Sequence, residues 1–147
     1  KTMTAAPGLM EKMWIEWECT RLVNRFNQLN DAGDFEAAVE LFAPDGSYLT
    51  PLTPVPVTGR AAILEMLRQR PSGTFRHFVT NVVIDVQSSV EARGKSYLIV
   101  AMSSESDPLK AVADRPPFTG EVDEHFILTP DGWRLGHRRG HGGISFG

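Results

Sequence analysis

The sequence predicts an α+β fold in a single domain spanning residues 1–147. Helical periodicity is confined to the first half of the chain, and long segments rich in Val, Ile, Tyr and Phe fill the second half. Elements segregated in this order are typical of an antiparallel sheet that helices cover on one face. The apolar content of 41% is that of a globular chain.

The first helix is predicted over residues 10–30, where apolar side chains recur at spacings of three and four. Gly33 is a natural end for this helix. The inward stripe is expected to contain Met10, Met13, Trp14, Trp17, Leu22, Phe26 and Leu29.

Two shorter helices are expected to follow. Asp34 is a suitable N-cap for the second, whose inward face would include Phe42 before residues 44–46 end it in a turn. Thr58 is expected to cap the third helix, over residues 60–70.

The strands are predicted from residue 74 onward, after a short strand candidate at residues 47–50 and a proline-rich segment. Residues 74–87 and 96–104 should pair across a turn at Arg93-Gly94. A second hairpin, residues 119–128 and 133–139, should turn across Pro130-Asp131-Gly132, where Asp-Gly is a good hairpin turn.

Both faces of the strand at residues 74–86 are apolar, and the early helices can cover only one of them. We therefore predict a homodimer through the outer face. Its expected members are Phe78, Val82, Ile84 and Val100.

Composition excludes several classes of function. The net charge of −3 gives no reason to bind nucleic acid, and the longest apolar run is too short to span a membrane. Cys19 is the only cysteine, and without a signal-peptide pattern we expect a cytoplasmic protein. Cys19 is interpreted as a buried apolar residue, with a reactive thiol as the alternative.

We predict neither a metal nor an organic cofactor. His137 and His141 have helical ligand spacing but stand among glycines and arginines, without nearby acids. No glycine-rich phosphate loop and no nucleophile elbow occurs in the sequence.

Three stretches in series resemble the SnoaL-like branch of the nuclear transport factor 2-like superfamily. They are residues 29–46, around the predicted helix junction, residues 75–85, in the long strand that carries His77, and residues 131–139, in the closing strand. The resemblance implies a cone-shaped α+β barrel, in which three N-terminal helices and a curved antiparallel sheet enclose a pocket for a small hydrophobic ligand. Ketosteroid isomerase, scytalone dehydratase and polyketide cyclases share this fold, so the fold alone does not determine the function.

The acid-base residues of two such enzymes are only partly present. For ketosteroid isomerase, the oxyanion tyrosine would fall near Phe26, and only Glu124 keeps an acid. For scytalone dehydratase, His77 matches the strand-opening histidine, whereas its helix-one Tyr-Asp pair would fall near Asn24-Arg25 and its second histidine near Met102.

His77 and Glu124 are the candidate catalytic residues. A neutral imidazole on the cavity face could take or give a proton near neutral pH, and a buried Glu124 could act as a base or a protonated donor. The alternatives are a structural hydrogen bond for His77 and an ion pair with Arg138 or Arg25 for Glu124. The predicted substrate-binding residues, which would line the pocket, are Tyr48, Thr50, Asn81, Tyr97, Phe26, Trp17 and His137.

The sequence therefore favours a cofactor-free acid-base lyase or isomerase, dehydratase-like or cyclase-like, acting on a small hydrophobic cyclic molecule. The alternative is a non-catalytic module of the same fold that binds a small molecule or supports another subunit. Epoxide or ester hydrolysis is a further chemistry, but it would need two acids around an arginine, and only Glu124 is available.

Overall fold

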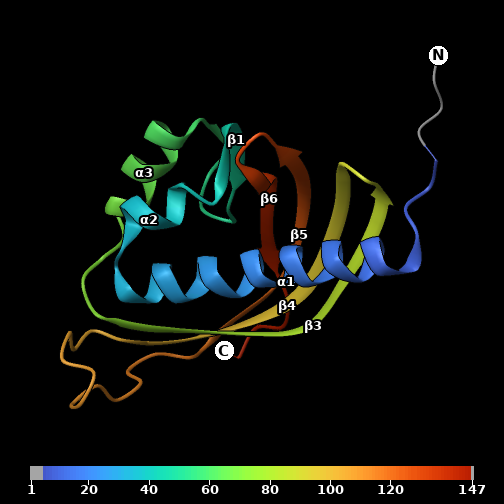
Figure 1. Cartoon of the computed structure of the whole chain (residues 1–147). Coiled ribbons are helices and arrows are strands. Elements are labelled where there is room, and N and C mark those ends of the chain that lie inside the picture. The colour runs from blue at the N-terminus through green and yellow to red at the C-terminus, as the bar shows by residue number, and fades with distance from the viewer. Residues whose placement is uncertain (1–4, 147) are drawn as a thin grey trace.

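In the computed structural model, which describes residues 5–146, one long helix crosses a curved six-stranded sheet (Figure 1). The helices are α1 (Leu9–Ala32), α2 (Phe35–Val39) and α3 (Arg60–Arg68). The strands are β1 (Phe42–Leu49), β2 (Val57–Thr58), β3 (Thr74–Ser88), β4 (Glu91–Ser103), β5 (Phe118–Thr129) and β6 (Gly132–Gly142). The predicted α+β class is confirmed.

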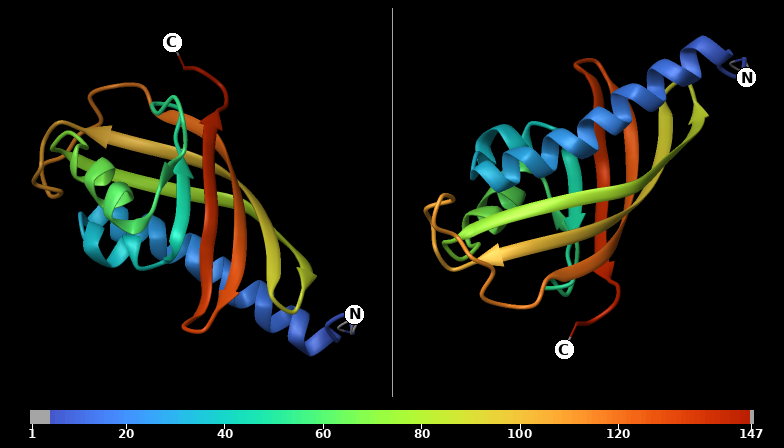
Figure 2. Two further views of the ribbon diagram at one scale, coloured as in Figure 1. Left: turned by 90° about the horizontal axis from the view of Figure 1, so that it is seen from above. Right: turned by 90° about the horizontal axis from the view of Figure 1, so that it is seen from below.

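The strand order is β2-β1-β6-β5-β4-β3, so β3 is the outermost strand at one side. All neighbours are antiparallel except β1 and β6, which run parallel. Figure 2 shows β3 to β6 bending around α1, with α2 and α3 beyond one end of that helix. The inner face of the sheet is thereby turned toward α1.

The local signals around α1 and α2 act as the sequence predicts. Gly33 ends α1 in the left-handed conformation at φ 72°, and the Asp34 carboxylate accepts from the backbone N–H of Ala37. However, α2 ends at Val39, and Phe42 begins β1 with a fully buried side chain. The predicted longer helix is wrong because β6 offers Phe42 a paired strand position beside Leu135.

Two other predicted boundaries are wrong. Gly59, at φ 90°, precedes α3 where Thr58 was expected to cap it, and Thr58 belongs to β2. Arg93 and Gly94 lie inside β4, and the hairpin turns instead at residues 89–90. The β5–β6 hairpin turns at residues 130–131, as the sequence predicts.

A bulge in β3 reverses part of the predicted inner and outer assignment. The pairing with β4 shifts between Thr80 and Val83, and Asn81 adopts φ 54° within this shift. Beyond the bulge, Val82 and Ile84 pack against the core. Val100 is also buried, so three of the four residues expected on the outer face lie inward, whereas Phe78 is 57% exposed.

The core lies between α1 and the inner face of the sheet. It includes the fully buried Phe26, Phe42 and Phe126. The N-terminal part of the predicted helical stripe is not in this core, because Met10, Trp14 and Trp17 are more than half exposed. Cys19 is buried, and burial, followed by nearby carboxylates, raises the pKa of its thiol to about 12. No helix among residues 5–146 is long and apolar enough to cross a membrane.

Candidate functional site

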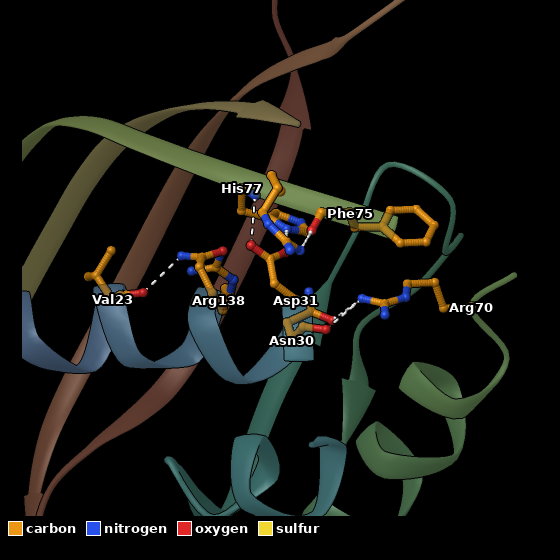
Figure 3. A network of polar contacts seen from close by, with 9 residues as sticks. Val23, Asn30, Asp31, Arg70, Phe75, His77 and Arg138 are labelled. Carbon is orange, nitrogen blue, oxygen red and sulfur yellow. Dashed lines mark hydrogen bonds and ion pairs between the residues drawn. The ribbon is translucent and has the colours of Figure 1, made fainter. Parts of the chain in front are cut away.

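The first polar cluster joins the end of α1 to the beginning of β3. The Asp31 carboxylate accepts two hydrogen bonds from His77, one from its backbone N–H at 2.9 Å and one from its ring Nδ1–H at 2.5 Å. The side chains are 14% and 12% exposed, respectively. Figure 3 shows them pointing toward one another.

This geometry fixes the tautomer of His77. An ionised carboxylate can only accept hydrogen bonds, so Nδ1 carries a proton, and whenever the ring is neutral its lone pair lies on Nε2. Two bonds to one carboxylate also fix the orientation of the ring. The pair therefore has the geometry of an imidazole held in place by a carboxylate, an arrangement also found where a histidine acts as a base.

The second polar cluster is a buried ion pair between β5 and β6. Glu124 and Arg138 are directly opposite one another, and Nη1 of Arg138 donates to Oε2 of Glu124 at 2.7 Å. Burial alone would lower the pKa of Arg138, but the Glu124 carboxylate raises it above its ordinary value. The guanidinium lies 4.6 Å from the ring centroid of Phe26 and 5.6 Å from that of Tyr48. The ion-pair alternative for Glu124 is therefore the one found.

The two clusters are neighbours along α1. Oδ1 of Asn27 is 3.5 Å from Nη2 of Arg138, and Asn27 precedes Asp31 by four residues. Residues at this spacing lie on the same side of a helix, about 6 Å apart. Asp31 with His77 and Arg138 with Glu124 therefore face a common region beneath α1.

An apolar wall continues from His77 on the inner face of the sheet. Val100, opposite His77 in β4, forms a buried cluster with Phe75, Leu98 and Val122. Three side-chain atoms of the described residues are buried without a hydrogen-bond partner, and they are Ser96 Oγ, Arg138 Nε and Arg134 Nε. The inner face thus carries an apolar wall, the imidazole of His77 and the unpartnered polar atoms of Ser96 and Arg138.

The predicted site residues divide into two groups. His77, Glu124, Phe26 and Tyr48 contribute to the two clusters on the inner face. The other five lie away from these clusters. They are Thr50, in a turn with Thr53, Asn81, in the β3 bulge, Tyr97, 47% exposed on the outer face, Trp17, stacked on Trp14, and His137, bonded to Ser47.

Physical reasons account for these misplacements. His137 pairs across the sheet with His125 on the outer face, because β5 and β6 shift register between His125 and Phe126. Burial, and then the charges of His125 and Arg139, lower the pKa of His137. Trp17 lies on the side of α1 that faces away from the sheet.

Sequence reasoning missed Asp31 because it placed the acid of the first helix near Asn24-Arg25. A signal was available. The buried stripe of α1 changes from apolar to polar at Asn27 and Asn30, with Asp31 beside them. Polar residues that continue an apolar helical face need partners in the interior, and here these are Arg138, Arg70 and His77.

No group of three or more His, Cys, Asp or Glu side chains within residues 5–146 is arranged to hold a metal ion. The predicted absence of a metal and of a cofactor stays a prediction. The chemistry that the described side chains can supply themselves is proton transfer at Nε2 of His77 and hydrogen-bond donation from Arg138 and Ser96.

Comparisons with known proteins agree with this architecture. The profile of the SnoaL-like domain family matches residues 11–139. A search of curated proteins finds no match. A large number of solved structures are similar in fold.

Three of these similar structures carry different names. A proposed scytalone dehydratase from Novosphingobium aromaticivorans has a TM-score of 0.78 at 17% identity, with 93% of this chain and 89% of that chain covered. A nuclear transport factor 2-like protein with a cystatin-like fold from the same organism has a TM-score of 0.69 at 23% identity, covering 88% and 82%. A hexachlorocyclohexane dehydrochlorinase has a TM-score of 0.78 at 10% identity, covering 93% and 90%.

Proposed function

The chain belongs to the SnoaL-like domain family, and from that premise we propose that it is a cofactor-free lyase that eliminates a small group from a hydrophobic cyclic molecule. The observation that carries the proposal is the 2.5 Å hydrogen bond from His77 Nδ1–H to Asp31. It leaves Nε2 as a base beside the apolar wall. The names of two similar structures, a proposed dehydratase and a dehydrochlorinase, both describe eliminations.

The proposed step is a β-elimination at two neighbouring ring carbons of the substrate. His77 Nε2 takes a proton from a ring carbon, and the electron pair of the broken C–H bond becomes a C=C bond to the neighbouring carbon. The bond from that carbon to the leaving group breaks, and the leaving group departs with its electron pair. Asp31 stabilises the imidazolium that forms, because its carboxylate faces the positive ring.

Arg138 and Ser96 are proposed to receive the polar end of the substrate. Both have a buried donor without a partner among the described residues, and both lie on the inner face of the sheet. Donors held in place before the reaction stabilise the developing negative charge on a leaving group or a carbonyl oxygen. Glu124 contributes by holding Arg138 in place.

The test uses two probe sets, cyclic β-hydroxy ketones and chlorinated cyclohexanes. Product is followed by the absorbance of the conjugated double bond or by chloride release. We expect His77→Ala and Asp31→Asn to lower kcat/KM by at least about 10²-fold, the usual contribution of a positioned base. His141→Ala, a histidine paired with Asp123 on the outer face, is the matched control and should keep full activity.

Undiminished turnover in His77→Ala on a probe that the wild type converts would exclude the base. Probe binding without turnover in the wild type, at an affinity that His77→Ala leaves unchanged, would favour the non-catalytic binding module.

A further inference from the structure

Arg70 connects the two segments that carry the Asp31–His77 pair. It lies just beyond α3 and reaches the last turn of α1, where Nη1 donates to the carbonyl oxygen of Asn30 at 2.6 Å and to its Oδ1 at 3.0 Å. Figure 3 shows this contact beside the Asp31–His77 pair. Its guanidinium also lies 5.0 Å from the ring centroid of Phe35 and 4.3 Å from that of Phe75.

The partners of Arg70 adjoin the pair in the sequence. Asn30 is bonded covalently to Asp31, and Phe75 lies two residues before His77, on the same face of β3. One side chain therefore contacts the neighbour of the acid and the neighbour of the base. We propose that Arg70 is a positioning residue, which holds Asp31 within hydrogen-bond reach of His77.

Arg70 adds a contact from outside the helix to the end of α1. The last carbonyl groups of a helix lack the usual partner within it, and here the backbone N–H groups of Gly33 and Asp34 donate to the carbonyls of Asn30 and Leu29. Asp31 stands in the last turn of α1, which ends at Ala32. Arg70 donates a further hydrogen bond to the Asn30 carbonyl in this turn. Because the same guanidinium packs on the ring of Phe75, it fixes the position of the turn relative to β3.

Solvent reaches this end of the helix. Asp31 and Arg70 line a hollow of about 560 Å³, together with Gln28, Gly73 and Thr74. A water molecule there could compete for the Asp31 carboxylate if α1 moved away from β3. Arg70 is half-buried, and this burial lowers its pKa, whereas the nearby charge of Asp31 opposes the shift.

Arg68 provides a contrast at close range. It belongs to the same segment, but its side chain is 50% exposed and bonds Glu36 on the surface. It contacts neither Asn30 nor Phe75 through any hydrogen bond or ring contact described for residues 5–146. Arg68→Met is therefore the matched control for Arg70→Met.

The experiment measures the Asp31–His77 hydrogen bond itself, by NMR of protein labelled with ¹⁵N at histidine. His77→Asn assigns the signals. Arg70→Met removes both charge-assisted hydrogen bonds to Asn30, and we expect it to speed solvent exchange of the His77 Nδ1 proton about tenfold and to mix the ring tautomers. Arg70→Lys, which can still donate to the Asn30 carbonyl, should recover part of the protection. Arg68→Met should match the wild type.

Unchanged exchange and tautomer in folded Arg70→Met would overturn the proposal. If that variant does not fold, Asn30→Ala decides. It removes the side-chain amide and with it the Arg70 contact to Oδ1, but it keeps the contact to the backbone carbonyl, so it should speed exchange by a smaller factor. No change there also overturns the proposal. The catalytic meaning of Arg70 rests on the proposed function, but this readout needs no substrate. A chain without lyase activity but with the expected exchange would defeat the proposed function alone.

Discussion

At the scale of single residues, Arg138 is a buried cation that depends on one carboxylate. Arg138 and Glu124 have side chains only 3% and 2% exposed, respectively. Removing one partner of a buried pair leaves the other charge without compensation. The burial that makes Arg138 a candidate for receiving a polar substrate also makes its surroundings intolerant of change.

We expect Arg138→Met to lower the free energy of unfolding by about 3–5 kcal/mol, since Glu124 would remain buried and unpaired. The double variant Glu124→Gln/Arg138→Met should recover most of this loss. Urea denaturation of the wild type, both single variants and the double variant measures the coupling. If the double variant loses the sum of the free energies that the two single variants lose, the interaction between Glu124 and Arg138 contributes nothing to stability.

His137 predicts a pH dependence of stability. Burial, followed by the charges of His125 and Arg139, lowers the pKa of His137 from its ordinary value of 6.5. The unfolded chain therefore takes up a proton at higher pH than the folded chain. The contribution of His137 is fully present above about pH 6.5 and is lost as the pH falls through the folded value.

We expect His137→Gln to reduce the loss of unfolding free energy between pH 7.5 and 5.5. Denaturation curves at both pH values, for the wild type and the variant, give the comparison. An equal loss in both proteins would mean that other groups account for the acid sensitivity.

At the scale of elements, the bulge in β3 determines which side chains reach the core. Asn81 adopts φ 54°, where Asn is tolerated and a β-branched residue is not. By shifting the register there, the strand places Val79 before the bulge and Val82 after it on the inner side. Without the shift, regular alternation would turn Val82, Ile84 and Val86 outward.

We expect Asn81→Val to lower the free energy of unfolding by about 1–3 kcal/mol, the cost of holding such a residue in the left-handed region. Asn81→Gly should be close to neutral, because glycine adopts this conformation without a steric penalty. Asp85→Val, at an exposed position of β3 beyond the bulge, is the control. Thermal melting separates the three variants, and equal melting of Asn81→Val and wild type would contradict the argument.

The same element shows what the sequence could and could not reveal. Alternation of Val, Ile and Phe was enough to predict β3 and its length, because the pattern is local. The bulge could not be predicted, since it depends on pairing with β4. Likewise, His77 was found from its strand and the resemblance, but its bond to Asp31 arises only when α1 packs beside β3.

At the scale of the whole molecule, the outer face of the sheet retains an apolar area. Phe78, Ile99 and Tyr97 are 57%, 43% and 47% exposed. Phe78 lies opposite Ile99, and Thr80 lies opposite Tyr97, so these residues are neighbours on β3 and β4. We propose that a second copy of the chain covers this area, with Phe78 retained from the sequence prediction.

Light scattering at micromolar concentration should give the mass of a dimer, and Phe78→Glu/Ile99→Glu should give that of a monomer. A charged side chain stays hydrated on the surface of the monomer but loses water in an apolar contact, so the substitutions destabilise the dimer more than the monomer. Trp17→Glu, on the exposed side of α1, is the control and should leave the mass unchanged. A monomeric wild type, or a dimer that the double variant does not affect, would refute this interface.

The bond from the His77 backbone N–H to Asp31 has a consequence beyond the chemistry of the imidazole. β3 is the outermost strand of the sheet, and its outward N–H groups would otherwise offer a template for another strand. The Asp31 carboxylate occupies one of them, so the acid that orients the base also protects the margin of the sheet against intermolecular pairing. On the proposed function, one side chain thus serves both the chemistry of His77 and the solubility of the fold, and an Asp31→Ala substitution would impair both.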